Sequence, residues 1–169
     1  MSRVADAWGF PADRMVLAGY RLWMIKGMTI TPDDLADFMT IHARAFSEDD
    51  RPLIADGLAG FIHALGHCAS CPLAFHDNVT DGAAAPACHD EGLVLALVSA
   101  LQYGMEDTAF LCATALACPR LAAPLAGAAG DCALRLKACG QWLSPVCRET
   151  VIGFIMAKAR SGKPVTTVH

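Results

Sequence analysis

Charged residues are scarce in this chain. Asp, Glu, Lys and Arg make up only 18% of its 169 residues and aromatic residues 7%, whereas hydrophobic residues make up 54%. So apolar a composition requires either an unusually large core or a surface that a partner covers. We therefore expect a homodimer, and another protein partner would meet the same requirement.

Long hydrophobic runs are also missing. The longest run free of charged residues and histidines, residues 92–105, has fourteen residues, whereas a membrane-spanning helix needs about 20. The first residues carry an early charge but no apolar stretch and no small-residue cleavage site, so they do not resemble a signal peptide. These absences predict a cytoplasmic protein without a membrane span.

Several functional signatures are absent as well. The net charge is −4, and the basic residues near the end of the chain are not interleaved with aromatic residues, so there is no strong nucleic-acid signal. We find no internal repeat, no phosphate-cradling glycine loop and no serine nucleophile elbow. No helix carries a carboxylate pair suited to di-iron chemistry.

Strand signals are lacking too, because no segment alternates convincingly with period 2. Prolines, glycines and capping residues instead predict helices that begin near residues 11, 31, 50, 90, 107 and 144. A further helix over residues 122–139 is expected, with its continuity across Gly127 and Gly130 left open. The sequence thus predicts an all-α, single-domain bundle of six to seven helices over residues 1–160, with a loosely ordered tail over 161–169.

Two of these helices are predicted in more detail. The second is expected to run to about Phe46 and to carry His42 on its buried face, as a core histidine. The helix after Asp90 and Glu91 is apolar on every side, which predicts a central buried helix. Residues 78–87 form an irregular Gly/Ala/Pro-rich loop.

What the chain does have is a concentration of metal- and redox-capable side chains. Residues 56–90 hold three of the eight cysteines and four of the six histidines. In a reducing cytoplasm, cysteines are metal ligands, redox catalysts or free thiols more often than disulfides. A Cys-x2-Cys pair flanked by histidines is typical of zinc sites, iron sites and dithiol redox centres.

The leading hypothesis is a small metal-binding accessory or sensor protein, with zinc first and iron second. Its thiolate ligands are predicted to be Cys68, Cys71 and Cys88. The fourth ligand is predicted to be one of three histidines: His67, His76 or His89. The Cys-x2-Cys pair is placed at a helix break, because Pro72 disfavours a helical residue before it.

A second group of candidates lies along the helix that precedes the cysteine pair. Asp56, Gly60, His63 and His67 share one face, and the two histidines are one turn apart. Both imidazoles can therefore reach a common metal, as in a His-Glu-x-x-His helix. Asp56 lies about 10 Å of axial rise from His63, so it can serve only as a neighbouring group. Gly60 leaves a gap that either a ligand or a neighbouring helix could enter.

The alternative from a different class is a dithiol redox or peroxide-reducing enzyme. Asp56 is followed after eleven residues by Cys68-x2-Cys71, and His76 follows after four more. This pattern resembles a displaced version of the motif in the alkylhydroperoxidase D and carboxymuconolactone decarboxylase-like family. The resemblance implies an all-helical fold, with Cys71 or Cys68 as nucleophile and His67 or His76 as the proton acceptor. A third hypothesis is a helical interaction module whose cysteines are buried and inert.

The other five cysteines are given simpler roles. Four of them are expected to be small core residues: Cys112, Cys118, Cys132 and Cys139. Cys147 is expected in the first turn of the last helix beside Arg148, where a thiol pKa is lowered and the sulfur can become reactive.

Overall fold

The computed structural model describes residues 8–42, 44, 46–70, 72–75, 86 and 88–161. These residues form seven α-helices: α1 (Pro11–Lys26), α2 (Pro32–His42), α3 (Arg51–Cys68), α4 (His89–Gln102), α5 (Glu106–Leu116), α6 (Ala122–Ala138) and α7 (Arg148–Ser161). Two short 3-10 turns, η1 (Gly27–Thr29) and η2 (Pro119–Leu121), follow α1 and precede α6. Within this part of the chain, β pairing is confined to one antiparallel bridge, between Ala69 and Ala117. The predicted all-α bundle is confirmed.

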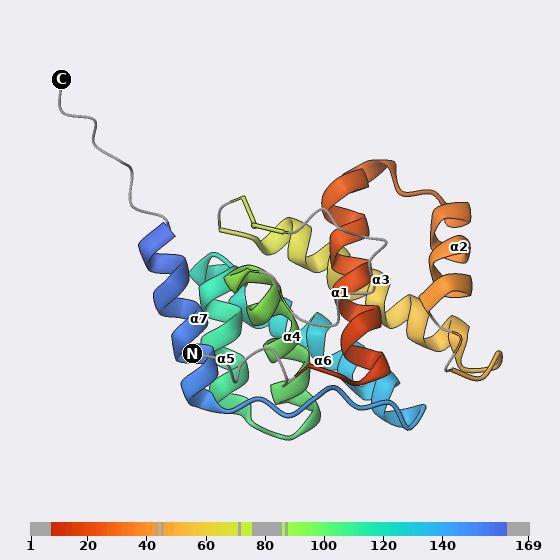
Figure 1. Cartoon of the computed structure of the whole chain (residues 1–169). Helices are drawn as coiled ribbons and strands as arrows, with labels where there is room; N and C mark the ends of the chain where they lie inside the picture. The colour runs from red at the N-terminus through yellow and green to blue at the C-terminus, as the bar shows by residue number, and fades with distance from the viewer. Residues whose placement is uncertain are drawn as a thin grey trace.

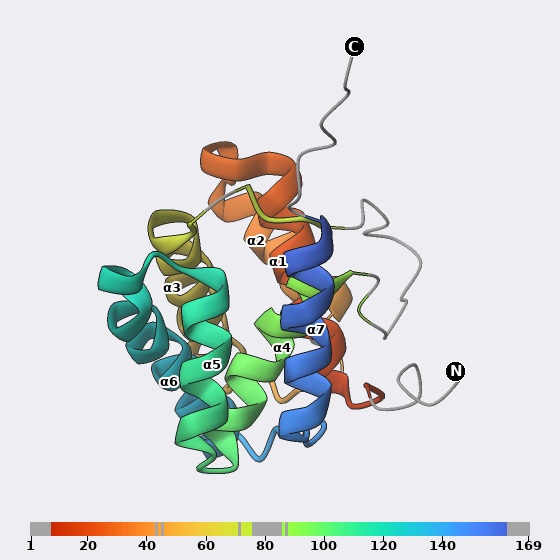
Figure 2. The same ribbon diagram turned by 90° about the vertical axis from the view of Figure 1, so that its left-hand side faces the viewer.

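Helix α4 is the central element of the bundle (Figures 1 and 2). Every one of its residues from Asp90 to Ala100 is buried, and it contacts α1, α5, α6 and α7. A helix enclosed in this way needs apolar residues on every side, or buried partners for its few polar ones, because no face meets water. The predicted central buried helix is therefore confirmed.

Helices α3 and α6 pack closely along one side of the bundle. Gly57 on α3 permits the approach, because a Cβ at this position would lie 3.3 Å from the Cα of Cys132. Helix α6 continues through Gly127 and Gly130. A Cβ added at either glycine would meet no other atom within 4 Å. Its buried residues, among them Leu125 and Cys132, hold the helix in place from the opposite face.

An extended segment, residues 141–147, connects α6 to α7 and is held by buried side chains. Asp13 of α1 accepts hydrogen bonds from the Ser144 N–H at 2.9 Å and from the Ser144 hydroxyl at 2.5 Å. The Ser99 hydroxyl of α4 donates to the Ser144 carbonyl, and the Leu143 N–H donates to Gln102. These side chains satisfy backbone groups that have no helical partner.

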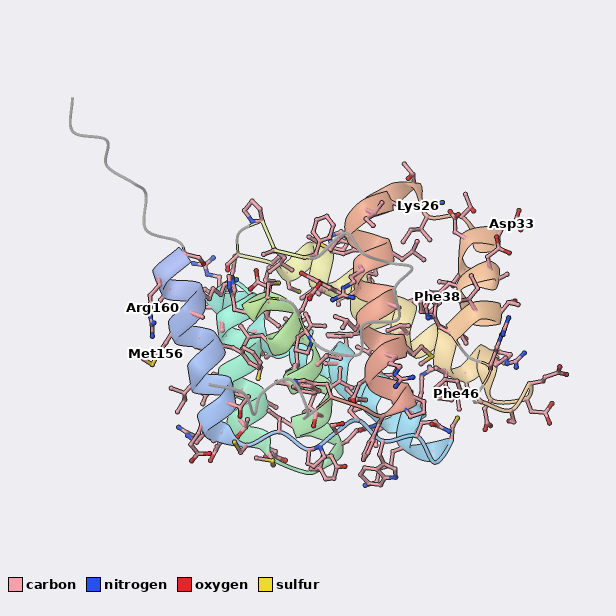
Figure 3. The ribbon with its side chains drawn as sticks, in the orientation of Figure 1. Lys26, Asp33, Phe38, Phe46, Met156 and Arg160 are labelled. Atoms are coloured by element: carbon pink, nitrogen blue, oxygen red, sulfur yellow. The ribbon has the colours of Figure 1, made fainter. Side chains whose placement is uncertain are left out.

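Two helix boundaries differ from the predictions. Helix α2 ends at His42 rather than near Phe46, although Phe46 is still buried. Figure 3 shows Phe38 on the side of α2 that faces α1 and α3. Helix α7 begins at Arg148, so Cys147 precedes the helix instead of lying in its first turn, and that prediction is wrong. The reason is that Ser144 is held in the extended segment by Asp13 and Ser99.

Among the described residues, no helix combines the length and apolarity needed to cross a membrane. The predicted loop over residues 78–87 lies outside the described residues except for residue 86. The tail after Ser161 lies outside them as well.

Candidate functional site

The side chains of His63 and His67 come together on the last turns of α3. Their Nε2 atoms are 3.1 Å apart, and their rings meet edge to face with centroids 4.5 Å apart. Both residues are exposed, as are Asp56 and Gly60 earlier on the same face. Gly60 has no neighbouring atom within 4 Å of an added Cβ, so no helix enters the gap there.

The separation of the two Nε2 atoms suits two ligands of one metal ion, but the contact itself has hydrogen-bond geometry, in which one ring nitrogen points at the other and not at a shared ion. A zinc–nitrogen bond is about 2.0–2.1 Å long, so an ion bound to both Nε2 atoms at this separation would subtend an angle of about 100°. The negative end of the α3 dipole also favours a cation near the last turn. Without a metal, the same contact is a hydrogen bond between the two rings, and the tautomer decides which of them donates.

An aromatic ring and a cavity lie beside the histidine pair. The indole of Trp23 on α1 lies directly over Gly66, the residue before His67, and leaves no room there for a Cβ. His63 also lines an apolar cavity of about 250 Å³ enclosed by α1, α2 and α3, with Trp23 and Phe38 among the other lining residues. The fluorescence of Trp23 should therefore respond to changes at the His63–His67 pair.

Cys68 is the last residue of α3 and is 5% exposed. Its carbonyl accepts a hydrogen bond from the Cys118 N–H at 3.0 Å. Burial raises the pKa of the Cys68 thiol, and the neighbouring Cys118 raises it further. Cys68 is thus in contact with Cys118, a cysteine that the sequence analysis assigned to the core.

Cys88 and His89 lie at the start of α4, as predicted, but they make contacts of their own. The Cys88 thiol donates to the carbonyl of Ala74 at 3.4 Å, and burial raises its pKa. The Nε2 atom of His89 is 3.6 Å from a carboxylate oxygen of Asp90. Both side chains are half-buried.

The described part of the predicted ligand set does not form one cluster. Cys71 and His76 lie outside the described residues. Among those that are described, no three His, Cys, Asp or Glu side chains are grouped so that they could hold a metal ion. The structure therefore brings together two of the seven candidates, His63 and His67, and a site centred on the thiolates stays a prediction.

The sequence analysis missed a buried ion pair between α1 and α4. Arg21 donates two hydrogen bonds to Glu91, from Nε to Oε1 at 2.8 Å and from Nη2 to Oε2 at 3.0 Å. The two side chains are 4% and 0% exposed. The sequence analysis uses Glu91 only to mark the start of the apolar helix. The sequence did contain a signal for this ion pair, namely two carboxylates at the start of an otherwise apolar helix. Such a helix is buried, and buried charges need partners.

A second ion pair lies next to the first. Asp90 accepts from the Lys158 ammonium of α7 at 2.6 Å and from the Ala74 N–H at 2.8 Å. The Tyr20 hydroxyl donates to the Ala74 carbonyl at 2.7 Å. Burial raises the pKa of Tyr20, and the nearby Asp90 adds to the effect. These bonds tie α1, α4, α7 and residues 72–75 together, which is a structural role.

The remaining cysteines divide into buried and partly exposed thiols. Cys112 and Cys132 are fully buried, and burial raises the pKa of each to about 12, so both are inert core residues as predicted. Cys118 and Cys139 are only half-buried. Cys147 is exposed, with its sulfur 3.1 Å from the Thr150 hydroxyl.

His42 is half-buried, and its ring packs against Phe38 with centroids 4.9 Å apart. Burial lowers its pKa. His42 thus lies at the edge of the core rather than within it, which corrects the expected core histidine.

No protein-family model matches the chain, and searches of curated proteins and of solved structures return no match. The function is therefore argued from the residues themselves.

Proposed function

We propose that this protein is a small metal-binding accessory or sensor protein of the cytoplasm, with zinc as the first candidate ion and iron as the second. The observation that carries the proposal is the 3.1 Å separation of the His63 and His67 Nε2 atoms on an exposed turn of α3. Imidazole nitrogen is a ligand that both metals accept.

The histidine pair is a better starting point than the thiols for physical reasons. Both imidazoles are exposed, so a side-chain rotation that breaks their mutual hydrogen bond is enough to turn both towards an ion from solvent. Cys68 is buried and Cys88 is bonded to a carbonyl, so each would have to give up its present surroundings to bind metal. Water can fill the remaining positions, and Cys71 and His76 are the candidates outside the described residues.

The test is a metal titration of tag-free protein that has been stripped with chelator and kept anaerobic. We expect about one zinc ion per chain. Alanine at either His63 or His67 should weaken binding by at least about tenfold, a size typical of a disturbed metal site. Co²⁺ should quench the fluorescence of Trp23, which lies over Gly66, and Trp23→Phe should remove most of that quenching.

Two controls make the result specific. His42→Ala removes a histidine on α2 that is outside the candidate set, and it should leave the affinity unchanged. Cys68→Ser/Cys71→Ser tests the thiolate ligands predicted from the sequence. Loss of metal in the cysteine variant but not in the histidine variants would move the site to the thiols. No bound metal in any variant, after metal was supplied during growth, would overturn the proposal.

We also propose that the protein associates as a homodimer. The support is a set of large apolar side chains on outer faces, of which Phe110 of α5 and Leu134 of α6 are 60% and 67% exposed. Burying such side chains against a second copy removes apolar area from water. Light scattering coupled to size exclusion should give twice the chain mass of 17.8 kDa, and a monomer at high concentration would contradict the proposal.

A further inference from the structure

Two cysteines that are far apart in the sequence meet where α3 and α5 end. The segment after α3 pairs with the segment after α5 through the antiparallel bridge between Ala69 and Ala117. Figure 2 shows the ends of both helices at the same end of the bundle. The residues next to this bridge, Cys68 before Ala69 and Cys118 after Ala117, lie opposite each other. The Cys118 N–H donates to the Cys68 carbonyl at 3.0 Å.

This register suits a disulfide. Opposed residues of an antiparallel pair that exchange both hydrogen bonds have Cα atoms about 5.5 Å apart, and Cys68, at the end of α3, makes one of these two bonds with Cys118. A disulfide requires a Cα separation of about 4.4–6.8 Å, so the backbone need not move far. The thiols are also close enough for Cys118 to raise the pKa of Cys68. Both are free thiols in this structure.

We propose that Cys68 and Cys118 form a reversible intramolecular disulfide when the protein meets a hydroperoxide. This proposal does not depend on metal binding. Of the two sulfurs, that of Cys118 belongs to the more exposed residue, so it meets the oxidant first. Cys68 is buried beside it and is placed to act as the resolving thiol.

The chemistry balances with the peroxide as the oxidant. The Cys118 thiolate, after losing its proton to water, attacks one peroxide oxygen; the O–O bond breaks and a sulfenic acid forms. The Cys68 sulfur then attacks the Cys118 sulfur, the S–O bond breaks and water leaves. Two thiols lose two protons and two electrons, and the peroxide is reduced to water and an alcohol, or to two waters.

The experiment treats EDTA-washed protein with about one equivalent of hydrogen peroxide, because an excess would oxidise methionine and block the cleavage used below, and maps the product without reductant. Cyanogen bromide cleaves after Met105 and separates Cys68, Cys71 and Cys88 from the five cysteines that follow. The cleavage is run in acid, where thiol–disulfide exchange is slow. We expect loss of two thiols and a link between fragments 40–105 and 106–156, which dithiothreitol should break.

Variants identify the two sulfurs. Cys68→Ser and Cys118→Ser should each abolish the link between fragments, whereas Cys71→Ser and Cys147→Ser should keep it. Cys118→Ala serves as a second variant should serine impair folding. The link closes a loop of about fifty residues, so oxidation should raise the Tm of the wild type by about 10 °C, but not that of Cys118→Ser.

Three results would overturn the proposal. The first is an oxidised protein whose fragments separate, because the bond then lies within one fragment, as a Cys68–Cys71 disulfide would. The second is a link that persists in Cys68→Ser, because another cysteine then bonds to the second fragment. The third is a full complement of thiols after peroxide treatment of folded protein. None of these depends on whether the protein binds zinc, so the two proposals fail separately.

Discussion

Replacing Glu91 with alanine is expected to lower the free energy of unfolding by about 3–5 kcal/mol, the usual cost of breaking a buried ion pair. Glu91 is fully buried and accepts two hydrogen bonds from Arg21. The variant leaves the buried guanidinium without this bidentate acceptor, and a charge that cannot reach water is costly. Urea unfolding followed by circular dichroism measures the change.

Two further variants test whether the loss of stability comes from burial of the charges or from loss of an ion pair as such. Asp131→Ala removes a carboxylate that also lies 2.8 Å from an arginine Nε, that of Arg135, but these side chains are 58% and 31% exposed. Its cost should be under about 1 kcal/mol. The double variant Arg21→Met/Glu91→Leu removes both charges and should be more stable than Glu91→Ala alone. Equal losses in Glu91→Ala and Asp131→Ala would contradict this account of the core.

Asp13→Ala is expected to cost about 3 kcal/mol, because each buried donor left without an acceptor costs about 1–3 kcal/mol. The Asp13 carboxylate accepts from the N–H groups of Ser144 and Phe10, both at 2.9 Å, and from the Ser144 hydroxyl. Its loss should free residues 141–147 from α1. Amide hydrogen exchange at Ser144 should accelerate together with the fall in stability. Unchanged exchange at this amide would show that Gln102 and Ser99 hold the segment alone.

The same carboxylate should give stability a distinctive dependence on pH. Burial raises the pKa of Asp13, although the bonds from Ser144 and Phe10 and the charge of Arg14 oppose the shift. The native state therefore binds its proton more tightly than the unfolded state, whose Asp pKa is 3.8. Stability from this group falls as pH rises from 3.8 through the raised native pKa.

Asp34 provides a control of opposite sign. Its pKa is lowered to about 2, first by the hydrogen bond from Lys26 and then by those from Thr31. Its contribution is present above pH 3.8 and is lost as pH falls towards 2. The free energy of unfolding, measured from about pH 2 to pH 7, should therefore change its dependence on pH in one direction in Asp13→Asn and in the other in Asp34→Asn. Identical slopes in the two variants would contradict the assignment.

Local features could be predicted from the sequence because they depend on neighbours within one or two helical turns. Pro11 and the Thr31-Pro32 pair mark helix starts, and an uninterrupted apolar run marks α4 as the buried helix. The pairing of His63 with His67 follows from their four-residue spacing, because that spacing places both side chains on one face of any α-helix. The inert character of Cys112 and Cys132 likewise follows from their place among apolar residues.

Tertiary structure alone decided the contacts that join distant parts of the chain. Arg21 and Glu91 are 70 residues apart, and Asp13 and Ser144 are 131 apart. No local period relates such positions, because their meeting depends on which helix faces pack together. The same holds for Cys118, which was predicted to be a core residue and instead stands opposite Cys68.

The sequence by itself therefore determined an all-α fold, its buried central helix and the approach of His63 to His67. These features follow from the α-helical repeat and from the need to remove apolar side chains from water. Packing decided which carboxylates became buried partners of Arg21 and Ser144, where residues 141–147 run, and which thiol Cys68 meets. Those outcomes depend on close contacts such as that of Gly57 with Cys132, which arise only when all the helices are in place.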